Sequence, residues 1–387
     1  MSSLTGAIHG FYLFDVAETI DLKALSQMFG AKASAATLYD KAPGPPRIRY
    51  IQPPIVIEGL ALDESQLEGF QVRVKFFDYG VVSLALTRPF AGSWGDLVAL
   101  GQDLIESEPL GQRAEEACRH IVGRVRECLQ DVRSAFLDEE YLAFVITTAD
   151  PPIDADRLLE QYGGEIAQLL RGERQALSAQ ERDETLRHRL SYLTDDLVIP
   201  AWNAALVYDT DAGAASTLEI LEFANSQLLE FRYHDERLEA ELGRIYTRLQ
   251  NPRWADRFIG RRNLRATRQL HSLLIDVNEL TDRTENALKL AGDLYTARLF
   301  GLVAARLGLD QWKHNVQDKL KTLDDIYRFA VEQTRVSQGN ILELMIVPDS
   351  DLRAGLRPAR DARLLRLPRL TRRSGRHAPA QPARLDG

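Results

Sequence analysis

Two segments near the C-terminal end, Asn263 to Ala305 and Asp310 to Met345, carry a stripe of positions spaced alternately four and three residues apart. The stripes consist of Leu270, Leu273, Val277, Leu280, Thr284, Ala287, Ala291 and Leu294 in the first segment, and of Val316, Leu320, Leu323, Tyr327, Ala330, Thr334, Ser337, Ile341 and Leu344 in the second. This spacing keeps one face toward a partner helix, as in a coiled coil. Gly308 suits the left-handed residue after a helix, and Asp310 suits the next cap. The pattern predicts an antiparallel coiled-coil hairpin.

The first 150 residues predict an α+β domain. Strands are expected at 8–16, 72–76, 81–86 and 141–148, where aromatic and β-branched residues are frequent. An extended stretch at 47–57 is interrupted by Pro53-Pro54, which indicates an edge strand or two short pieces. Helices are expected at 21–29, 93–106 and 112–134. The order fits a mixed α/β sandwich with helices on one face of the sheet, in a ferredoxin-like arrangement.

Two aromatic stretches could serve a binding site or the core. Phe76-Phe77-Asp78-Tyr79-Gly80-Val81-Val82 reads as a strand, a tight turn and a strand, and Trp202-Asn203 lies in a later expected strand. Aromatic side chains in strands are more often part of the core than a binding platform. We therefore expect both stretches to pack inside the protein.

Residues 151–250 are expected to be mostly helical. Helices are predicted near 154–172 and 178–193, with Gly163-Gly164 as a break, and a long helix at 214–250. A last strand is expected at 197–208. The predicted division is an α+β head at 1–150, a helical linker region with a last strand at 151–212, a coiled-coil stalk at 213–347 and a disordered basic tail at 348–387.

Composition narrows the class of protein. The chain has 387 residues, 45% hydrophobic and 27% charged, with a net charge of −8, which argues against nucleic acid as a general partner. Its two cysteines, Cys118 and Cys128, are too far apart on a helix to bond, and two free thiols fit a reducing compartment. Neither a secretory signal nor an apolar run long enough to span a membrane is found in the sequence.

Residues 351–387 differ sharply from the rest, because they hold ten Arg and three Asp but neither Lys nor Glu. The simplest explanation is a disordered basic tail. A change of reading frame, or a divergent end in place of a membrane anchor, would also explain the abrupt change in composition after Val347.

The candidate chemical sites are few. His234 with Asp235, Glu236 and Glu230 could hold a cation, although a solvated helix face is the simpler explanation. Asp195-Asp196 could act as paired acids or as a polar turn. Glycine-rich phosphate loops and a nucleophile elbow are absent from the sequence, so we expect no bound cofactor, no metal and no assigned catalytic residue.

A basic cluster is the strongest candidate for a binding site. Guanidinium groups concentrated over one loop and two helical turns attract phosphate or anionic lipid head groups. A solubilising start of a helix is the alternative. The cluster consists of Arg253, Arg257, Arg261, Arg262, Arg265 and Arg268.

Two short stretches carry a family resemblance. Phe-Asp-Tyr-Gly-Val-Val at 77–82 and Leu-Glu-Leu-Met-Ile-Val at 342–347 resemble the YagE-like, required-for-meiotic-nuclear-division family. The resemblance implies a protein of unknown biochemical function whose final coiled coil runs into a membrane-spanning helix, with an overall plan similar to CorA-type magnesium channels. The sequence departs from that plan, because Gly339 is followed by Asn340 in place of the Gly-Met-Asn signature and a spanning helix does not follow Val347.

These observations lead to two hypotheses. The first is a non-enzymatic scaffold or membrane-surface tether that forms a homo-oligomer through its coiled-coil hairpin and contacts an anionic membrane surface. It would be cytoplasmic or peripheral to a membrane, without nucleic acid as a partner. The alternative is an α+β head that binds a ligand or catalyses a reaction that the sequence does not identify.

Overall fold

The computed structural model describes residues 3–35, 52–58, 67, 69–105, 108–249, 275, 277–278, 280–282 and 294–345. Met1–Thr334 form one compact unit, and Arg335–Gly387 form a second, of which only the end of one helix is described. The fold and the sites below belong to the first unit.

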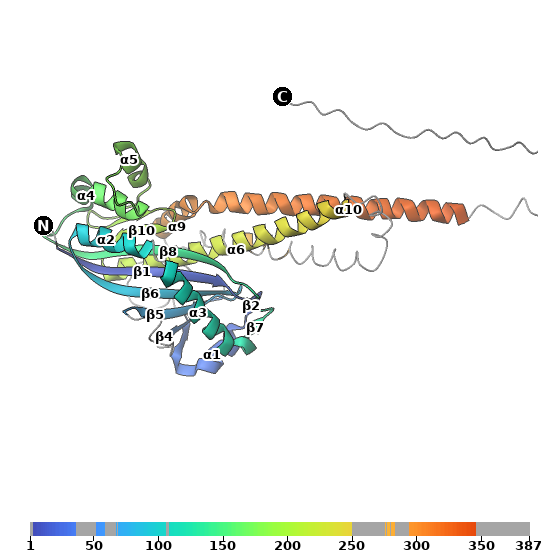
Figure 1. Ribbon diagram of the computed structural model, residues 1–387, viewed down its shortest axis with the longest axis horizontal. Helices are drawn as coiled ribbons and strands as arrows, with labels where there is room; N and C mark the ends of the chain where they lie inside the picture. The colour runs from blue at the N-terminus through green and yellow to red at the C-terminus, as the bar shows by residue number, and fades with distance from the viewer. Residues whose placement is uncertain are drawn as a thin grey trace, which may run out of the picture. The chain divides into compact units, whose positions relative to one another are not determined.

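An eight-stranded sheet is the centre of the fold (Figure 1). Its strand order is β3-β4-β5-β6-β1-β8-β10-β9, and neighbours are antiparallel except for the parallel pair β8 and β10. A separate small ladder joins β2 (Thr19–Ile20) to β7 (Leu129–Gln130). The strands of the sheet are β1 Ser3–Asp15, β3 Ala33–Ala35, β4 Ile55–Glu58, β5 Gln71–Phe76, β6 Val81–Gly92, β8 Leu137–Asp150, β9 Leu197–Pro200 and β10 Ala204–Tyr208.

The central strand, β1, is covered on both faces, which explains its nearly continuous apolar sequence. Ile8 and Tyr12 point to one layer of helices, and Phe11 and Leu13 point to the other. The first layer contains α1 Leu22–Phe29, α2 Trp94–Ile105, α3 Glu108–Arg124, α4 Ala155–Arg171 and α5 Ala179–Arg187, with short 3-10 turns at Gly30–Lys32 and Arg126–Cys128.

The second face of the sheet is covered by α6 (Asp211–Leu249), α9 (Leu294–Arg306) and the start of α10 (Leu309–Met345). Phe11 and Tyr141 of the sheet share one apolar cluster with Leu221 and Phe231 of α6. Helix α6, predicted to begin the stalk, therefore packs on the sheet and completes the α/β sandwich. The predicted domain boundaries themselves stay a prediction.

The mixed α/β class is confirmed. Strands β5, β6, β1 and β8 are adjacent and antiparallel, with α1 between β1 and β5 and with α2 and α3 between β6 and β8. This is the order strand, helix, two strands, helices, strand. The prediction of helices on one face of the sheet is wrong, because α6, α9 and the start of α10 cover the second face.

Several local predictions are wrong. The expected strand at 197–208 is two strands, β9 and β10, because residues 201–203 turn the chain back. Trp202 lies in this turn with 54% of its surface exposed, so it does not pack in the core. Gly163-Gly164 does not break a helix but lies inside α4. A Cβ atom on Gly163 would lie 3.1 Å from Leu186 Cδ1, so this glycine lets α4 pack closely against Leu186. Helices α3 and α5 end earlier than expected.

The predicted hairpin is described only in part. Gly308 has the expected positive φ of 66°, but α10 begins at Leu309, so Asp310 lies in its first turn and not at its cap. Val316, Leu320 and Leu323 of the predicted stripe are buried in the cluster that includes α6. The segment at 263–305 lies mostly outside the described residues, so a coiled-coil hairpin stays a prediction.

Ion pairs also join α10 to α6. Lys319 Nζ lies 3.0 Å from Asp235 Oδ1 and 2.7 Å from Glu239 Oε2. The N-terminal part of α10 is thus fixed against α6 of the same chain.

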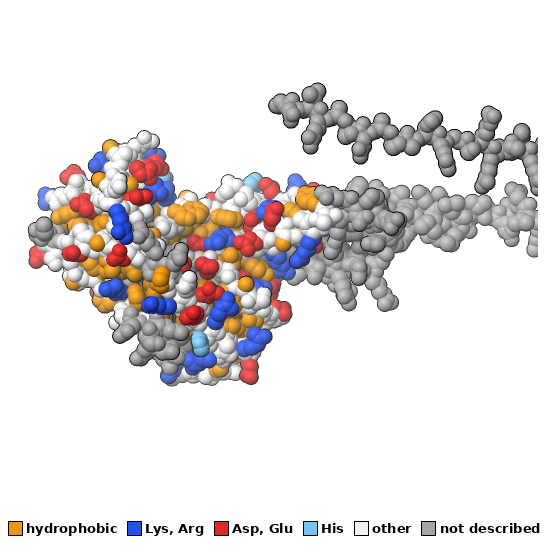
Figure 2. Space-filling view, in the orientation of Figure 1, with side chains coloured by type: hydrophobic (Ala, Val, Ile, Leu, Met, Phe, Trp, Pro, Cys, Tyr) orange, Lys and Arg blue, Asp and Glu red, His pale blue; other side chains and the backbone are white. Residues whose placement is uncertain are grey.

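The surface and the cysteines add two observations. Cys118 and Cys128 are both free and buried. Figure 2 shows acidic and basic side chains interspersed over the described part of the visible face. Within the described residues, every helix is too short or too polar to cross a bilayer. The tail at 348–387 lies outside the described residues.

A pair of glycine substitutions tests this fold. Gly80 in the β5–β6 turn has a φ of 93°, and a Cβ atom would lie 1.9 Å from the carbonyl oxygen of Ala17. We expect Gly80→Ala to lower the free energy of unfolding by at least about 2 kcal/mol, because the left-handed backbone alone costs 1–2 kcal/mol. Gly164→Ala, inside α4 with open space around it, should raise the free energy of unfolding by up to about 1 kcal/mol. Urea unfolding measures both, and equal effects would contradict the structure.

Candidate functional site

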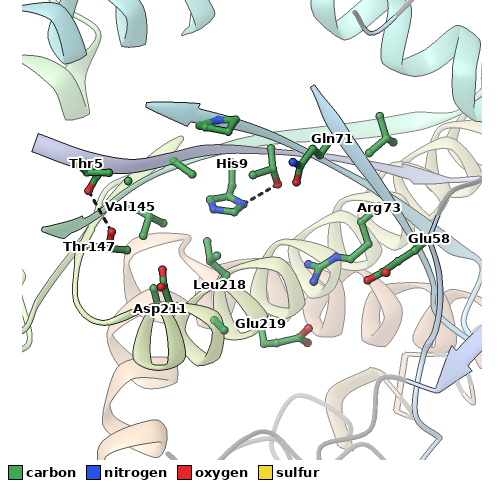
Figure 3. A pocket seen from close by; sticks show the side chains of 17 residues that line it. Thr5, His9, Glu58, Gln71, Arg73, Val145, Thr147, Asp211, Leu218 and Glu219 are labelled. Atoms are coloured by element: carbon green, nitrogen blue, oxygen red, sulfur yellow. Dashed lines mark hydrogen bonds between the residues drawn. The ribbon is translucent and has the colours of Figure 1, made fainter. Parts of the chain in front are cut away.

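A cavity of about 770 Å³ lies between the second face of the sheet and the first turns of α6 (Figure 3). The sheet contributes mostly polar groups to its wall, namely Thr5, His9, Glu58, Gln71, Arg73, Thr87 and Thr147. Helix α6 contributes charged, small and apolar residues, namely Asp211, Ala214, Ala215, Leu218 and Glu219. The described wall therefore combines hydrogen-bonding groups with a short apolar surface.

The sequence explains why a space remains here. Along β1, the face that carries Phe11 and Leu13 in the core carries Thr5, Ala7 and His9 at the other end of the strand. Helix α6 begins with Asp-Ala-Gly-Ala-Ala, whose side chains are too small to fill the volume above that end of the sheet. Large apolar residues close the contact further along α6, so the space becomes a cavity.

His9 projects into this space from β1 (Figure 3). Its Nδ1 atom lies 3.0 Å from the Thr87 hydroxyl oxygen, and either atom can be the donor. Burial, and next the positive charge of Arg73, lower the pKa of His9 to about 4. The imidazole is therefore neutral at pH 7, and its Nε2 atom can donate a hydrogen bond to a ligand or accept one from it, depending on the tautomer.

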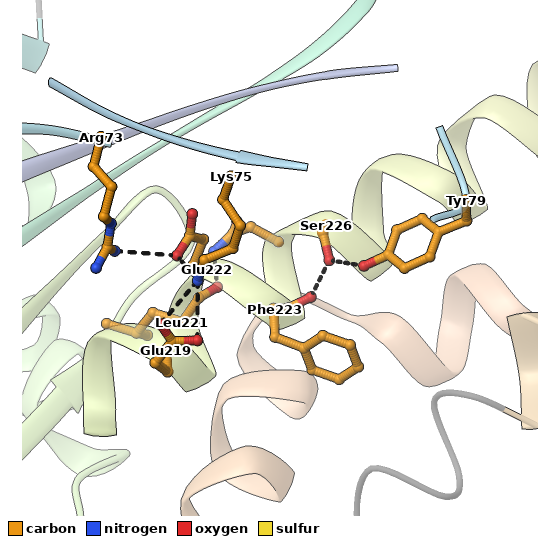
Figure 4. A network of polar contacts seen from close by, with 9 residues as sticks. Arg73, Lys75, Tyr79, Glu219, Leu221, Glu222, Phe223 and Ser226 are labelled. Atoms are coloured by element: carbon orange, nitrogen blue, oxygen red, sulfur yellow. Dashed lines mark hydrogen bonds and ion pairs between the residues drawn. The ribbon is translucent and has the colours of Figure 1, made fainter. Parts of the chain in front are cut away.

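A buried cluster of charges forms the adjoining contact between β5 and α6 (Figure 4). The Lys75 side chain is only 1% exposed, and its Nζ lies 2.9 Å from both carboxylate oxygens of Glu219. Lys75 also donates to the fully buried Glu222. Arg73 Nη2 lies 3.4 Å from Glu222 Oε2. These ion pairs fix α6 relative to β5, and Arg73 and Glu219 belong to both the cluster and the cavity wall.

Polar contacts continue along α6 beyond this charge cluster. Tyr79 and Ser226 hydroxyl oxygens lie 2.7 Å apart, and Ser226 donates to the Phe223 carbonyl oxygen. Gln227 Nε2 donates to the Tyr79 oxygen at 3.1 Å. The tight turn after β5 is thus bonded to the buried side of α6.

A second polar cluster joins the far end of β1 to α6. Arg133 pairs with Asp15 at 3.2 Å and Glu18 at 2.9 Å, and its guanidinium lies 4.1 Å from the ring centre of Tyr233. Burial raises the pKa of Asp15 to about 6, although Arg133 opposes this shift. The charged groups of this second cluster pair mainly with one another, which indicates that the cluster has a structural role.

The candidate cation site around His234 is not formed by the described residues, and the simpler explanation of a solvated helix face does not hold for His234 itself. His234 is buried, and its Nε2 lies 3.8 Å from Glu230 Oε2. Burial, and next the charge of Arg237, lower the pKa of His234 to about 4. Asp235 pairs with Lys319 and Glu236 is exposed, so the carboxylates do not converge. Among the described residues, none of the groupings of three or more His, Cys, Asp and Glu side chains could hold a metal ion.

Of the two other candidates from the sequence, the structure describes Asp195-Asp196 but not the basic cluster. Asp196 accepts hydrogen bonds from the backbone nitrogens of Tyr192 and Leu193, each at 2.7 Å, while Asp195 is exposed. The interpretation as a polar turn is confirmed. The basic cluster lies outside the described residues and stays a prediction; it comprises Arg253, Arg257, Arg261, Arg262, Arg265 and Arg268.

Sequence reasoning missed the cavity because its residues come from distant segments. His9, Arg73 and Asp211 belong to three elements that only the fold brings together. One signal was available, since Arg73 and Lys75 alternate in β5 and must point to the same face of the sheet. Two cations on a face covered by a helix require carboxylate partners.

The pH dependence of stability tests the neutral state of His9. In the unfolded chain this group titrates near its usual pKa of 6.5, but in the folded protein it titrates near 4. Between these values the unfolded chain binds a proton here that the folded protein does not, so acid destabilises the folded state. Relative to His9→Gln, wild-type protein should lose up to about 1.4 kcal/mol per pH unit as the pH falls from 6.5 to 4.

Urea unfolding of both proteins at pH steps from about 8 to 4.5 measures this difference. Above about pH 7.5 the offset between the two stability curves should be constant, because His9 is neutral in both folded and unfolded states. Curves that stay parallel down to the lowest pH would show that His9 is not held neutral.

Comparison with known proteins places the chain in a family. Residues 5–215 match the sequence profile described as "Uncharacterized protein MJ0711, N-terminal domain". Uncharacterized protein MJ0711 of Methanocaldococcus jannaschii is 27% identical over 195 residues, which are 50% of this chain and 59% of that relative. The chain thus spans about three fifths of the relative's length. No solved structure matches significantly.

These matches confirm the expectation of an uncharacterised family, but the family is that of MJ0711 and not specifically the YagE-like one. The matched region includes nearly all of the sheet, the first turn of α6 and most of the described cavity wall. Because it covers more than half of the sequence, the chain belongs to the family defined by the N-terminal domain of MJ0711.

Proposed function

We propose that the α/β sandwich binds a small polar molecule in the cavity between the sheet and α6. The observation that carries this proposal is the preformed space of about 770 Å³, lined by His9, Arg73 and several threonines. Ligand pockets in proteins typically measure about 300–1,000 Å³ and combine apolar walls with a few convergent polar groups.

The rigidity of the walls supports binding. Most of the described wall lies on hydrogen-bonded strands and on a helix that is ion-paired to the sheet. Polar groups held this way lose little freedom when a ligand binds, so less affinity is lost to ordering. The cavity therefore offers fixed hydrogen-bonding positions to a ligand.

The chemistry of His9 favours binding over acid–base catalysis. A general base works best when its pKa lies near the working pH. The pKa of His9 is lowered to about 4, so at neutral pH the imidazole is a weak base and cannot supply a proton. Its role in this proposal is to accept or donate a hydrogen bond.

Filling the cavity tests the proposal. Ala215 lines the cavity and is solvent-exposed, so Ala215→Trp should occupy ligand space with little effect on folding. Ala212→Trp is the matched control, because Ala212 is exposed in the same turn of α6 but does not line the cavity. The measurement is the ligand-induced shift in melting temperature over a panel of amino acids, amines, organic acids, sugars and nucleotides.

We expect at least one class of compound to stabilise wild-type protein and the Ala212→Trp variant, but not the Ala215→Trp variant. Binding of a ligand to the folded state raises the melting temperature by mass action. A panel without any stabilising compound, or one whose effects persist in Ala215→Trp, would contradict a ligand site in the cavity.

Self-assembly through the helices is the second proposal, and the continuous helix α10, Leu309–Met345, favours it. In this proposal the C-terminal helical segments and the six arginines of the basic cluster form a stalk that makes a homo-oligomer and contacts an anionic membrane surface. The stripe residues in the N-terminal part of α10 are already buried against the rest of the chain. Assembly would therefore use the stripe residues in the C-terminal part of α10.

Sedimentation of the full chain at micromolar concentration tests this second proposal. An oligomer is expected, and Ile341→Asp in the predicted stripe should dissociate it, because a charge in a coiled-coil seam is costly. Gln338→Asp, outside the stripe, is the matched control. A compact monomer in the wild-type chain would contradict self-assembly.

A further inference from the structure

The described cavity wall carries more negative than positive charge. Three carboxylates face one guanidinium, which leaves an excess of two negative charges; these residues are Glu58, Asp211, Glu219 and Arg73. The buried pair of Lys75 and Glu222 behind the wall adds one charge of each sign and leaves the excess unchanged. Since His9 is neutral, it does not offset this excess.

The two cations of this region are already paired. Lys75 contacts both Glu219 and Glu222. Arg73 contacts Glu222. An anionic ligand would have to compete with Glu222 for Arg73 and would also meet the excess negative charge, so the wall disfavours anions.

Two carboxylates lie at opposite ends of the cavity, as Figure 3 shows for Asp211 and Glu58. Neither has an ion pair with another residue in the described part of the chain. Leu218 lies between them in the same view, and Val145 and Ala215 add apolar surface. A single ion could not reach both ends, whereas a molecule with an alkyl chain between two charged groups could.

We propose that the cavity binds a small organic dication, with one ammonium or guanidinium group at Asp211, a second at Glu58 and an alkyl chain along Leu218. This inference rests on the proposed function, because it identifies the chemical class of ligand for the same cavity. The neutral imidazole of His9 and the threonine hydroxyls accept hydrogen bonds from the remaining N–H groups of the ligand. The apolar wall excludes water from the alkyl chain.

A series of four-carbon probes separates charge from size. The probes are 1,4-diaminobutane, 4-amino-1-butanol, 1,4-butanediol and succinate, titrated into the full chain at pH 7 by calorimetry. Salt near 0.15 M screens general attraction to the acidic protein surface. We expect the diamine to bind about tenfold more tightly than the amino alcohol, and the amino alcohol to bind more tightly than the diol, because a hydrogen bond to a charged group strengthens binding by about this factor.

Neutralising either end of the cavity tests the assigned contacts. Asp211→Asn and Glu58→Gln should each weaken diamine binding about tenfold and leave diol binding unchanged. Glu236→Gln is the matched control, because Glu236 is exposed on α6 and does not line the cavity. Ala215→Trp should abolish binding of the diamine.

The outcomes distinguish this inference from the proposed function. Tightest binding by succinate or the diol, abolished by Ala215→Trp, would overturn the cationic ligand and keep the cavity as a ligand site. Diamine binding that survives Ala215→Trp would be general surface attraction and would overturn the inference. If all four probes fail while another class in the wider panel binds in an Ala215-dependent way, the dication is wrong and the ligand site stands.

Discussion

The buried ion pairs between β5 and α6 determine where the rest of the second layer lies. Lys75 is almost completely removed from water, and its charge is compensated by Glu219 and Glu222 of α6. Removing one partner of a buried pair typically costs about 3–5 kcal/mol, because the other charge is left unpaired. The helix can therefore adopt only the register that brings these carboxylates onto Lys75. In that register its small N-terminal residues lie over the polar end of β1, and a cavity remains.

The cavity is thus a consequence of two neighbouring sequence features. Large apolar residues such as Leu221 and Phe231 pack α6 against the sheet along most of their contact. At the helix start, Ala214 and Ala215 replace them, opposite His9 and the threonines of the sheet. Polar groups are costly to bury unless they are hydrogen-bonded, and here they face a space that a polar ligand can enter. The same architecture explains both the stability of the layer and its capacity to bind.

The sequence predicted the local elements better than their assembly. Periodicity placed β5, α1, α4 and α6 nearly correctly, because alternation and cap residues such as Asp21 act over short distances. It did not show that α6 covers the sheet, since a long amphipathic helix can pack on a sheet or on another helix. His9 was not identified as a candidate, because its environment depends on Thr87 and Arg73, which are distant in sequence. The exposed position of Trp202 could not be predicted, because hydrophobicity alone does not reveal a turn.

A double-mutant cycle between Lys75 and Glu222 tests the central claim that this buried pair holds α6 on the sheet. The cycle compares the free energies of unfolding of wild-type protein, Lys75→Met, Glu222→Met and the double variant. We expect Lys75→Met to lower the free energy of unfolding by about 3–5 kcal/mol, with most of this loss recovered in the double variant, since two apolar side chains can replace a buried ion pair. Additive losses, with little recovery in the double variant, would contradict the claim.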